Sequence, residues 1–211
     1  MKIVLLACLA TSLLAACSKK EADPQPQPAP AAPVAPIQAA TINVAFDAYA
    51  TASAPAATQS LSLLATKPTY QLFTDRLEVK LQATDPGNSS FVQDRVQFVI
   101  PISRQKSGLV GTYTLASQPD ASLGDVLLTY TRYINLTDTY PNAYGSNAQR
   151  LEGSFVITSY DATRRLISGS YTVKALNAKD AFVFLNIRYI GDQRRDGDLR
   201  LTGTFQEVPL Q

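Results

Sequence analysis

The sequence predicts an all-β protein, built as a single antiparallel β-sandwich or a strongly curved barrel of about eight to ten strands. Two observations favour this class. After residue 41 the apolar pattern has a period of two, and no stretch keeps the 3.6-residue spacing of an amphipathic helix. In addition, a glycine followed by Ser or Thr and then by an aromatic residue occurs four times.

The clearest strand is predicted at Arg76–Ala83, where charged and apolar residues alternate without a break. This alternation is typical of a half-buried antiparallel strand. Further strands are expected at residues 41–49, 93–102, 126–136, 151–160, 166–175, 181–190 and 199–208. Turn-forming residues separate several of them, at Asp85-Pro86-Gly87-Asn88, Tyr160-Asp161-Ala162-Thr163 and Asp196-Gly197.

The repeated glycine motif indicates how the core is filled. Its four copies are Gly111-Thr112-Tyr113, Gly153-Ser154-Phe155, Gly169-Ser170-Tyr171 and Gly203-Thr204-Phe205. Positions i and i+2 of a strand share one face, so each glycine leaves space beside its ring. A ring from a neighbouring strand can lie across that space. We therefore expect a curved sheet with an aromatic core; the alternative is that the rings stack against a ligand.

The first seventeen residues have the features of a secretory signal peptide. A basic start at Lys2 precedes an apolar run, Ile3–Leu14, that is shorter than the roughly 20 residues of a spanning helix. Leu14-Ala15-Ala16-Cys17 resembles the lipobox of bacterial lipoproteins. The resemblance implies removal of residues 1–16 and a diacylglycerol and an N-acyl chain on Cys17. Two or more such chains anchor a protein stably. The alternative is an ordinary signal peptide that leaves Cys17 free.

The next residues predict location and reach. Ser18 stands where inner-membrane lipoproteins often carry aspartate, so the resemblance implies the outer membrane; the periplasmic or cell-surface side stays open. The segment Ala22–Ala40 is almost wholly Pro, Ala and Gln. We expect residues 17–40 to be a lipidated spacer that spans up to roughly 60 Å in polyproline II form. A Pro-rich ligand for a partner is the alternative. Residues 41–211 then form the β-domain.

Composition excludes several classes of function. The chain has no histidine, which removes Ser-His-Asp triads and histidine metal sites. From Thr41 onward 16 basic residues face 15 acidic ones, so the clustered positive charge of a nucleic-acid-binding protein is missing. The only cysteines are Cys8 and Cys17, and neither lies in the predicted domain. We expect a non-enzymatic protein without a cofactor other than its covalent lipid.

Two segments are candidate sites. A loop over residues 137–149 carries Tyr140, Asn142 and Tyr144, whose rings and amide suit contact with a sugar or another ligand. The second contains Asp192, Asp196 and Asp198, which could bind calcium or supply the carboxylates of a polysaccharide hydrolase. Arg194 and Arg195 stand between these acids, so a solvated hairpin loop with internal ion pairs is the main interpretation.

Three C-terminal segments, residues 153–161, 166–171 and 197–209, resemble a group of small Bacteroidetes cell-envelope lipoproteins without a defined biochemical activity. Those proteins pair a strand ending in Tyr-Asp with a Ser-Gly-x-aromatic strand and end on a strand closing in Val-Pro. The resemblance implies a β-domain at the cell envelope. The expected function is binding of a glycan, a small molecule or a protein, or a structural and assembly role; the alternative is a carboxylate-based hydrolase.

Overall fold

The computed structural model describes residues 39–66, 68–85, 88–134, 141–183, 192 and 194–211, the side chains of residues 85 and 88–92 excepted. Cys17, Tyr140, the predicted signal peptide and most of the predicted spacer lie outside these residues. So does most of the strand expected at 181–190. The structure therefore bears on the β-domain alone.

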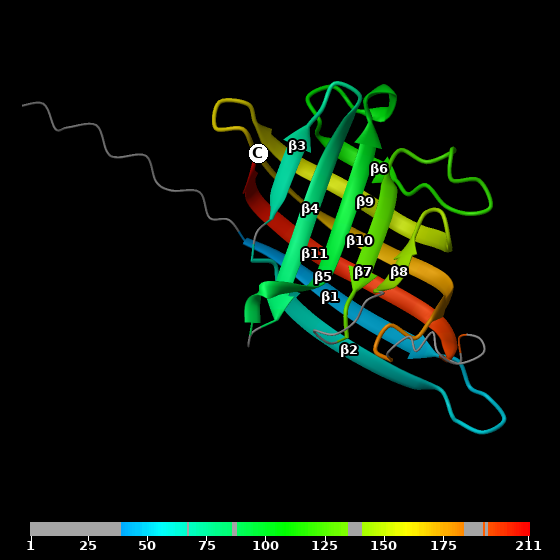
Figure 1. The fold of residues 1–211 in the computed structure, drawn as a ribbon. Helices are drawn as coiled ribbons and strands as arrows, with labels where there is room; N and C mark the ends of the chain where they lie inside the picture. Colours follow the sequence, from blue (N-terminus) through cyan, green and yellow to red (C-terminus); the bar gives the residue numbers. More distant parts are fainter. Residues whose placement is uncertain (1–38, 67, 86–87, 135–140, 184–191, 193) are drawn as a thin grey trace, which may run out of the picture. The chain divides into compact units, whose positions relative to one another are not determined.

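The domain is a β-sandwich of two antiparallel sheets, and neither sheet closes into a barrel. Figure 1 shows the strands of one sheet crossing those of the other obliquely. The six-stranded sheet has the order β2-β1-β11-β10-β9-β6. Its strands are β1 (Ala39–Ala48), β2 (Ala57–Leu64), β6 (Gly111–Thr114), β9 (Arg150–Asp161), β10 (Leu166–Lys179) and β11 (Asp196–Pro209). The five-stranded sheet has the order β3-β4-β5-β7-β8. Its strands are β3 (Thr69–Leu72), β4 (Arg76–Asp85), β5 (Asn88–Pro101), β7 (Leu127–Arg132) and β8 (Asn142–Gly145), and a short 3₁₀ helix, η1, covers Ile102–Arg104.

The core lies between the sheets and is rich in aromatic rings, as predicted. Phe98 on β5 stacks on Phe155 of β9 with the ring centroids 4.3 Å apart, and it lies 5.1 Å from the ring of Tyr171 on β10. Phe155 also stacks on Phe205 of β11 at 5.5 Å. All four side chains are buried. Phe98 thus joins one sheet to the other at the centre of the domain.

All four glycine motifs fall in the six-stranded sheet, on β6, β9, β10 and β11. On β10 and β11 the expected shielding is reciprocal, since Gly169 pairs with Phe205 and Tyr171 pairs with Gly203. A Cβ on Gly169 would lie 2.5 Å from Cζ of Phe205, and one on Gly203 would lie 2.5 Å from the Tyr171 hydroxyl. Each ring therefore covers the bare backbone of the strand beside it.

Several strand boundaries differ from the sequence prediction. The predicted strands do not include β2, β3, β6 and β8, because β2 is largely exposed and the other three have only four residues each. For β6 the glycine motif was the only indication. Asp196 and Gly197 begin β11 instead of forming a turn, since they pair with Lys179 and Ala178 of β10. Residues 181–183 form a turn, not a strand. The turn after Asp161 is confirmed: its Oδ1 accepts the backbone N–H groups of Thr163 and Arg164 at 2.9 Å.

Candidate functional site

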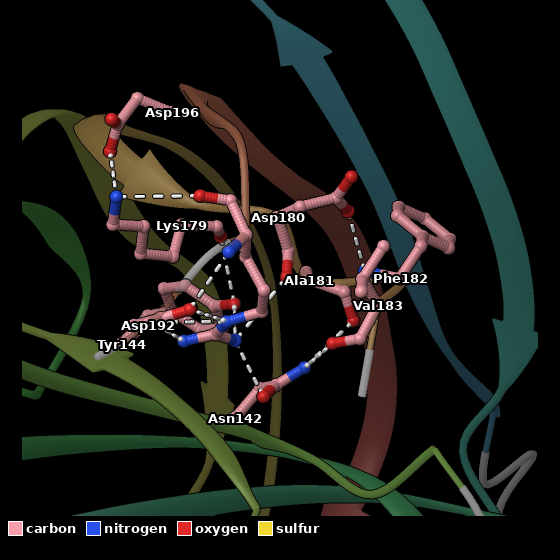
Figure 2. Close-up of polar contacts among 10 residues, drawn as sticks. Asn142, Tyr144, Lys179, Asp180, Ala181, Phe182, Val183, Asp192 and Asp196 are labelled. Carbon is pink, nitrogen blue, oxygen red and sulfur yellow. Dashed lines mark hydrogen bonds and ion pairs between the residues drawn. The ribbon is translucent and has the colours of Figure 1, made fainter. Parts of the chain in front are cut away.

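A part-buried polar network lies beside β8, and Figure 2 shows Asn142, Tyr144 and Asp192 within it. Arg194 makes most of its hydrogen bonds. Nη1 of Arg194 donates to Oδ1 of Asn142 at 2.5 Å and to the Tyr144 hydroxyl at 3.3 Å. The same nitrogen donates to the carbonyl oxygen of Asp180 at 3.3 Å. Nε and Nη2 donate to the two carboxylate oxygens of Asp192 at 2.9 and 2.6 Å. One guanidinium therefore joins the two segments that the sequence presents as separate candidate sites.

Asn142 and Tyr144 come from a strand, so the expectation of a loop is wrong at these positions. Both side chains point into the sandwich and are buried, with 2% and 4% of their surface exposed. The Asn142 amide donates to the carbonyl oxygens of Ala181 and Val183 at 3.2 and 3.0 Å, and the Tyr144 hydroxyl donates to that of Lys179 at 2.9 Å. These groups hold the neighbouring chain segment and are not presented to a ligand in this conformation. Tyr140 lies outside the described residues.

A buried ion pair continues the network into the core. Nη1 of Arg132 lies 2.9 Å from each carboxylate oxygen of Asp94, and the Tyr130 hydroxyl donates to the same carboxylate at 2.5 Å. Strand pairing places these residues side by side, because Asp94 on β5 is opposite Arg132 on β7, and Arg132 is opposite Asn142 on β8. The Arg132 guanidinium also lies 4.9 Å from the centre of the Phe182 ring. Hydrogen bonds and this contact fasten residues 179–183 to the five-stranded sheet.

The electrostatics of the network follow from burial and from paired charges. Burial raises the pKa of Asp94, and the charge of Arg132 together with hydrogen bonds from Tyr130 and Arg132 offsets part of that rise. Burial also raises the pKa of the Tyr130 and Tyr144 hydroxyls well above the ordinary value, so both stay protonated donors. Hydrogen bonds from Arg194 lower the pKa of Asp192, which stays a carboxylate. These protonation states keep the hydrogen bonds that hold residues 179–183 against β8.

The three candidate calcium ligands do not form a metal site. Asp192 binds Arg194, Asp196 lies 2.8 Å from Nζ of Lys179, and Asp198 lies 2.7 Å from Nζ of Lys174. Asp198 also accepts a short hydrogen bond from the Tyr49 hydroxyl. In the part of the chain that the structure describes, no three acidic side chains are grouped so as to hold a metal ion. The calcium hypothesis is therefore not supported, because each carboxylate already neutralises a different cation. Ion pairs within the segment were the main interpretation of the sequence; Asp192–Arg194 is such a pair, whereas Asp196 and Asp198 pair with lysines of β10.

A surface hollow of about 370 Å³ brings two other carboxylates together, those of Asp161 and Glu207, beside Arg164. Asp161 accepts the backbone N–H groups of its own turn. Glu207 forms an ion pair with Arg164 at 3.2 Å. Both carboxylates are thus engaged within the protein, and neither is arranged as the free acid or base that a glycosidase needs.

The residues that sequence reasoning missed are Asp94, Arg132 and the central role of Arg194. A signal was present for the first two. Asp94 shares its strand parity with Val96 and Phe98, and Arg132 shares its parity with Leu128 and Tyr130, so each charge falls on an apolar face. Opposite charges on the apolar faces of two strands indicate a buried pair. Nothing in the sequence indicates that Arg194 reaches Asn142.

Comparison with protein-family models, with curated proteins and with solved structures finds no match for this chain. Among the described residues, no helix is long and apolar enough to span a membrane.

Proposed function

We propose that this chain is a lipid-anchored envelope lipoprotein of the kind that its C-terminal segments resemble, with a non-enzymatic β-domain that binds a partner or serves in assembly. One observation carries the proposal. A lipobox-like Cys17 is followed by a proline-rich segment, and the sandwich begins at Ala39, where that segment ends. In the sequence, the lipobox-like anchor, the proline-rich segment and the folded domain follow one another in that order.

The make-up of the domain is compatible with an envelope location. Its sequence has no cysteine after Cys17, so the domain does not depend on a disulfide in an oxidising compartment. Stability comes instead from a continuous core of buried apolar side chains contributed by both sheets. The three carboxylates of the acidic candidate segment, those of Asp192, Asp196 and Asp198, are engaged in ion pairs, which favours a binding or assembly role over hydrolysis.

The anchor is tested by comparing two cysteine variants in a Gram-negative host. Cys17→Ser should abolish incorporation of labelled palmitate and move the protein from the membrane fraction to the soluble fraction, because two or more acyl chains are needed for stable binding. Cys8→Ser is the matched control, since Cys8 leaves with the predicted signal peptide, and it should behave as the parent. A Cys17→Ser protein that stays lipidated and bound to membranes would refute the proposal.

The side of the membrane and the partner need a second experiment. Protease treatment of intact cells separates a surface domain, which is digested, from a periplasmic one, which is protected. Crosslinking in living cells followed by mass spectrometry then identifies what lies beside the domain. We expect a recurrent protein or glycan neighbour that is lost in Cys17→Ser. Recovery of the same neighbours in both proteins would argue against a function that depends on the anchor.

A further inference from the structure

The sandwich has four edge strands, and one of them differs from the others. Strands β3, β6 and β8 have four residues each, and short edge strands are a common protection against unwanted pairing. Contacts also cover two of them: Tyr70 on β3 accepts the N–H of Gln211, and Thr114 on β6 accepts that of Val126. Strand β2 has eight residues and, within the described part of the chain, pairs only with β1.

The sequence of β2 lacks the usual protection of an edge. Ala57–Leu64 contains no charged residue and no proline, the two features that most often discourage pairing at an edge. Its inner face carries Leu61 and Leu63, which are only half-buried, and on its outer face Leu64 is 74% exposed. Pairing with a further strand would cover these side chains.

The direction of the free backbone groups can be read from the pairing with β1. Ala65 donates its N–H to the carbonyl of Ala40, and the register of the two strands continues without a shift. Hydrogen-bonded pairs alternate along an antiparallel ladder, so the odd-numbered residues of β2 bond to β1. The N–H and C=O groups of the even-numbered residues therefore face the free edge: Thr58, Ser60, Ser62 and Leu64.

We propose that the free edge of β2 pairs antiparallel with β2 of a second copy of this chain, about a two-fold axis at Leu61. In this register Thr58 meets Leu64 of the other copy, and Ser60 meets Ser62, so all four residues with free backbone groups find counterparts. Shifting the axis to Ser60 or Ser62 leaves one residue of each strand without its counterpart. Of the three registers, the one with its axis at Leu61 therefore gives hydrogen-bond partners to the largest number of free N–H and C=O groups.

Side chains and charge favour an identical partner. A two-fold axis normal to the sheet keeps both inner faces on the same side, so the two Leu61 side chains pack on each other and each Leu63 packs diagonally beside them. Identical charges would meet near such an axis, and β2 carries none. The result is one continuous twelve-stranded sheet. An interface made by one strand pair is small, so we expect a dimer with an affinity in about the micromolar range.

The register makes a specific crosslinking prediction for the full chain in intact cells. Leu61→Cys places two thiols opposite each other at the axis, in a non-hydrogen-bonded pair within reach of a disulfide. Leu63→Cys is the matched control: the same residue change on the same face, but with the two thiols about 13 Å apart along the strands. Under mild oxidation we expect roughly tenfold more disulfide-linked dimer from Leu61→Cys. The unsubstituted chain reports any background from Cys8 and Cys17.

A second variant tests the backbone pairing. The N–H of Ser60 faces the free edge, so Ser60→Pro keeps the bonds to β1 and removes a bond to the partner; proline is tolerated at such positions. Added to Leu61→Cys, it should abolish the crosslink while thermal unfolding followed by circular dichroism stays cooperative. Should this variant fail to fold, Ser60→Lys serves the same purpose, with Thr112→Lys on β6 as its control at the opposite edge. Equal crosslinking from both cysteine variants would overturn the proposal. So would a Leu61→Cys chain that stays monomeric, or one that is joined to a different protein.

Discussion

Nη1 of Arg194 lies 2.5 Å from Oδ1 of Asn142, and this hydrogen bond joins residues 52 positions apart in the sequence. The Asn142 amide also holds the carbonyl oxygens of Ala181 and Val183. A single buried side chain therefore connects β8 to two segments that precede β11.

Asn142→Ala should lower the free energy of unfolding by about 2–4 kcal/mol, because it removes one acceptor of the part-buried Arg194 guanidinium and the amide donor to the carbonyl oxygens of Ala181 and Val183. Urea denaturation measures the loss. Asn147→Ala is the matched control, since the Asn147 side chain is exposed, and it should change stability by less than about 0.5 kcal/mol. Equal effects of the two substitutions would mean that the network contributes nothing to stability.

Gly203→Ala should destabilise the domain by about 3 kcal/mol, since the added methyl group meets atoms that cannot move apart. A Cβ there would lie 2.1 Å from the backbone oxygen of Thr41 and 2.5 Å from the Tyr171 hydroxyl. Gly108→Ala offers a comparison with open space around the Cβ, where only the positive φ of 69° costs energy, about 1 kcal/mol. Thermal unfolding distinguishes them. A Gly203→Ala protein as stable as the parent would show that the reciprocal ring shielding is not tight.

Arg132→Met should lower the free energy of unfolding at neutral pH by about 3–5 kcal/mol, because it leaves the buried Asp94 carboxylate unpaired. The pKa of Asp94 should then rise further, since the offset from Arg132 is lost. A carboxyl with a raised pKa in the folded state stabilises the fold at acid pH and less so as the pH rises through that pKa. The variant should therefore be more stable near pH 4 than near pH 7.

Two further proteins complete the test of the ion pair. Replacing the buried group as a whole by Asp94→Leu, Tyr130→Phe and Arg132→Met should restore much of the stability, because no charge of the Asp94–Arg132 pair remains buried. Arg150→Met, which alters an exposed arginine, should leave both stability and its pH dependence near those of the parent. A pH-independent loss in Arg132→Met would contradict burial of a charged Asp94.

Asp192→Asn should reduce the loss of stability at acid pH. Hydrogen bonds from Arg194 lower the pKa of Asp192 in the folded state, whereas an unfolded aspartate titrates near about 3.9. Its contribution is therefore present above about pH 4 and is lost as the pH falls through the lowered value. Arg194→Ala should reduce the same loss of unfolding free energy at acid pH. The double variant should show no further reduction. Additive effects would show that Asp192 and Arg194 titrate independently.

The sequence alone determined the class of fold and the make-up of the core. Alternation of the kind seen at Arg76–Ala83 places apolar side chains on one face, and two such sheets must bury those faces against each other. The glycine motifs predicted an aromatic core with rings over bare backbone, as Tyr171 and Gly203 confirm. These features are local, because strand periodicity and the steric needs of glycine depend on residues only a few positions apart.

Only the tertiary structure decided which polar residues meet. Asn142 and Tyr144 have the composition of a binding loop, yet strand pairing with β7 turns them into the sandwich. Arg194, just before β11, reaches both side chains because β11 pairs with β10 in the six-stranded sheet. The tertiary structure also decided that β2 is a long edge strand. Its eight uncharged residues have free backbone groups only because the six-stranded sheet ends at this strand. Such contacts depend on the order of strands in space, which local sequence patterns do not encode.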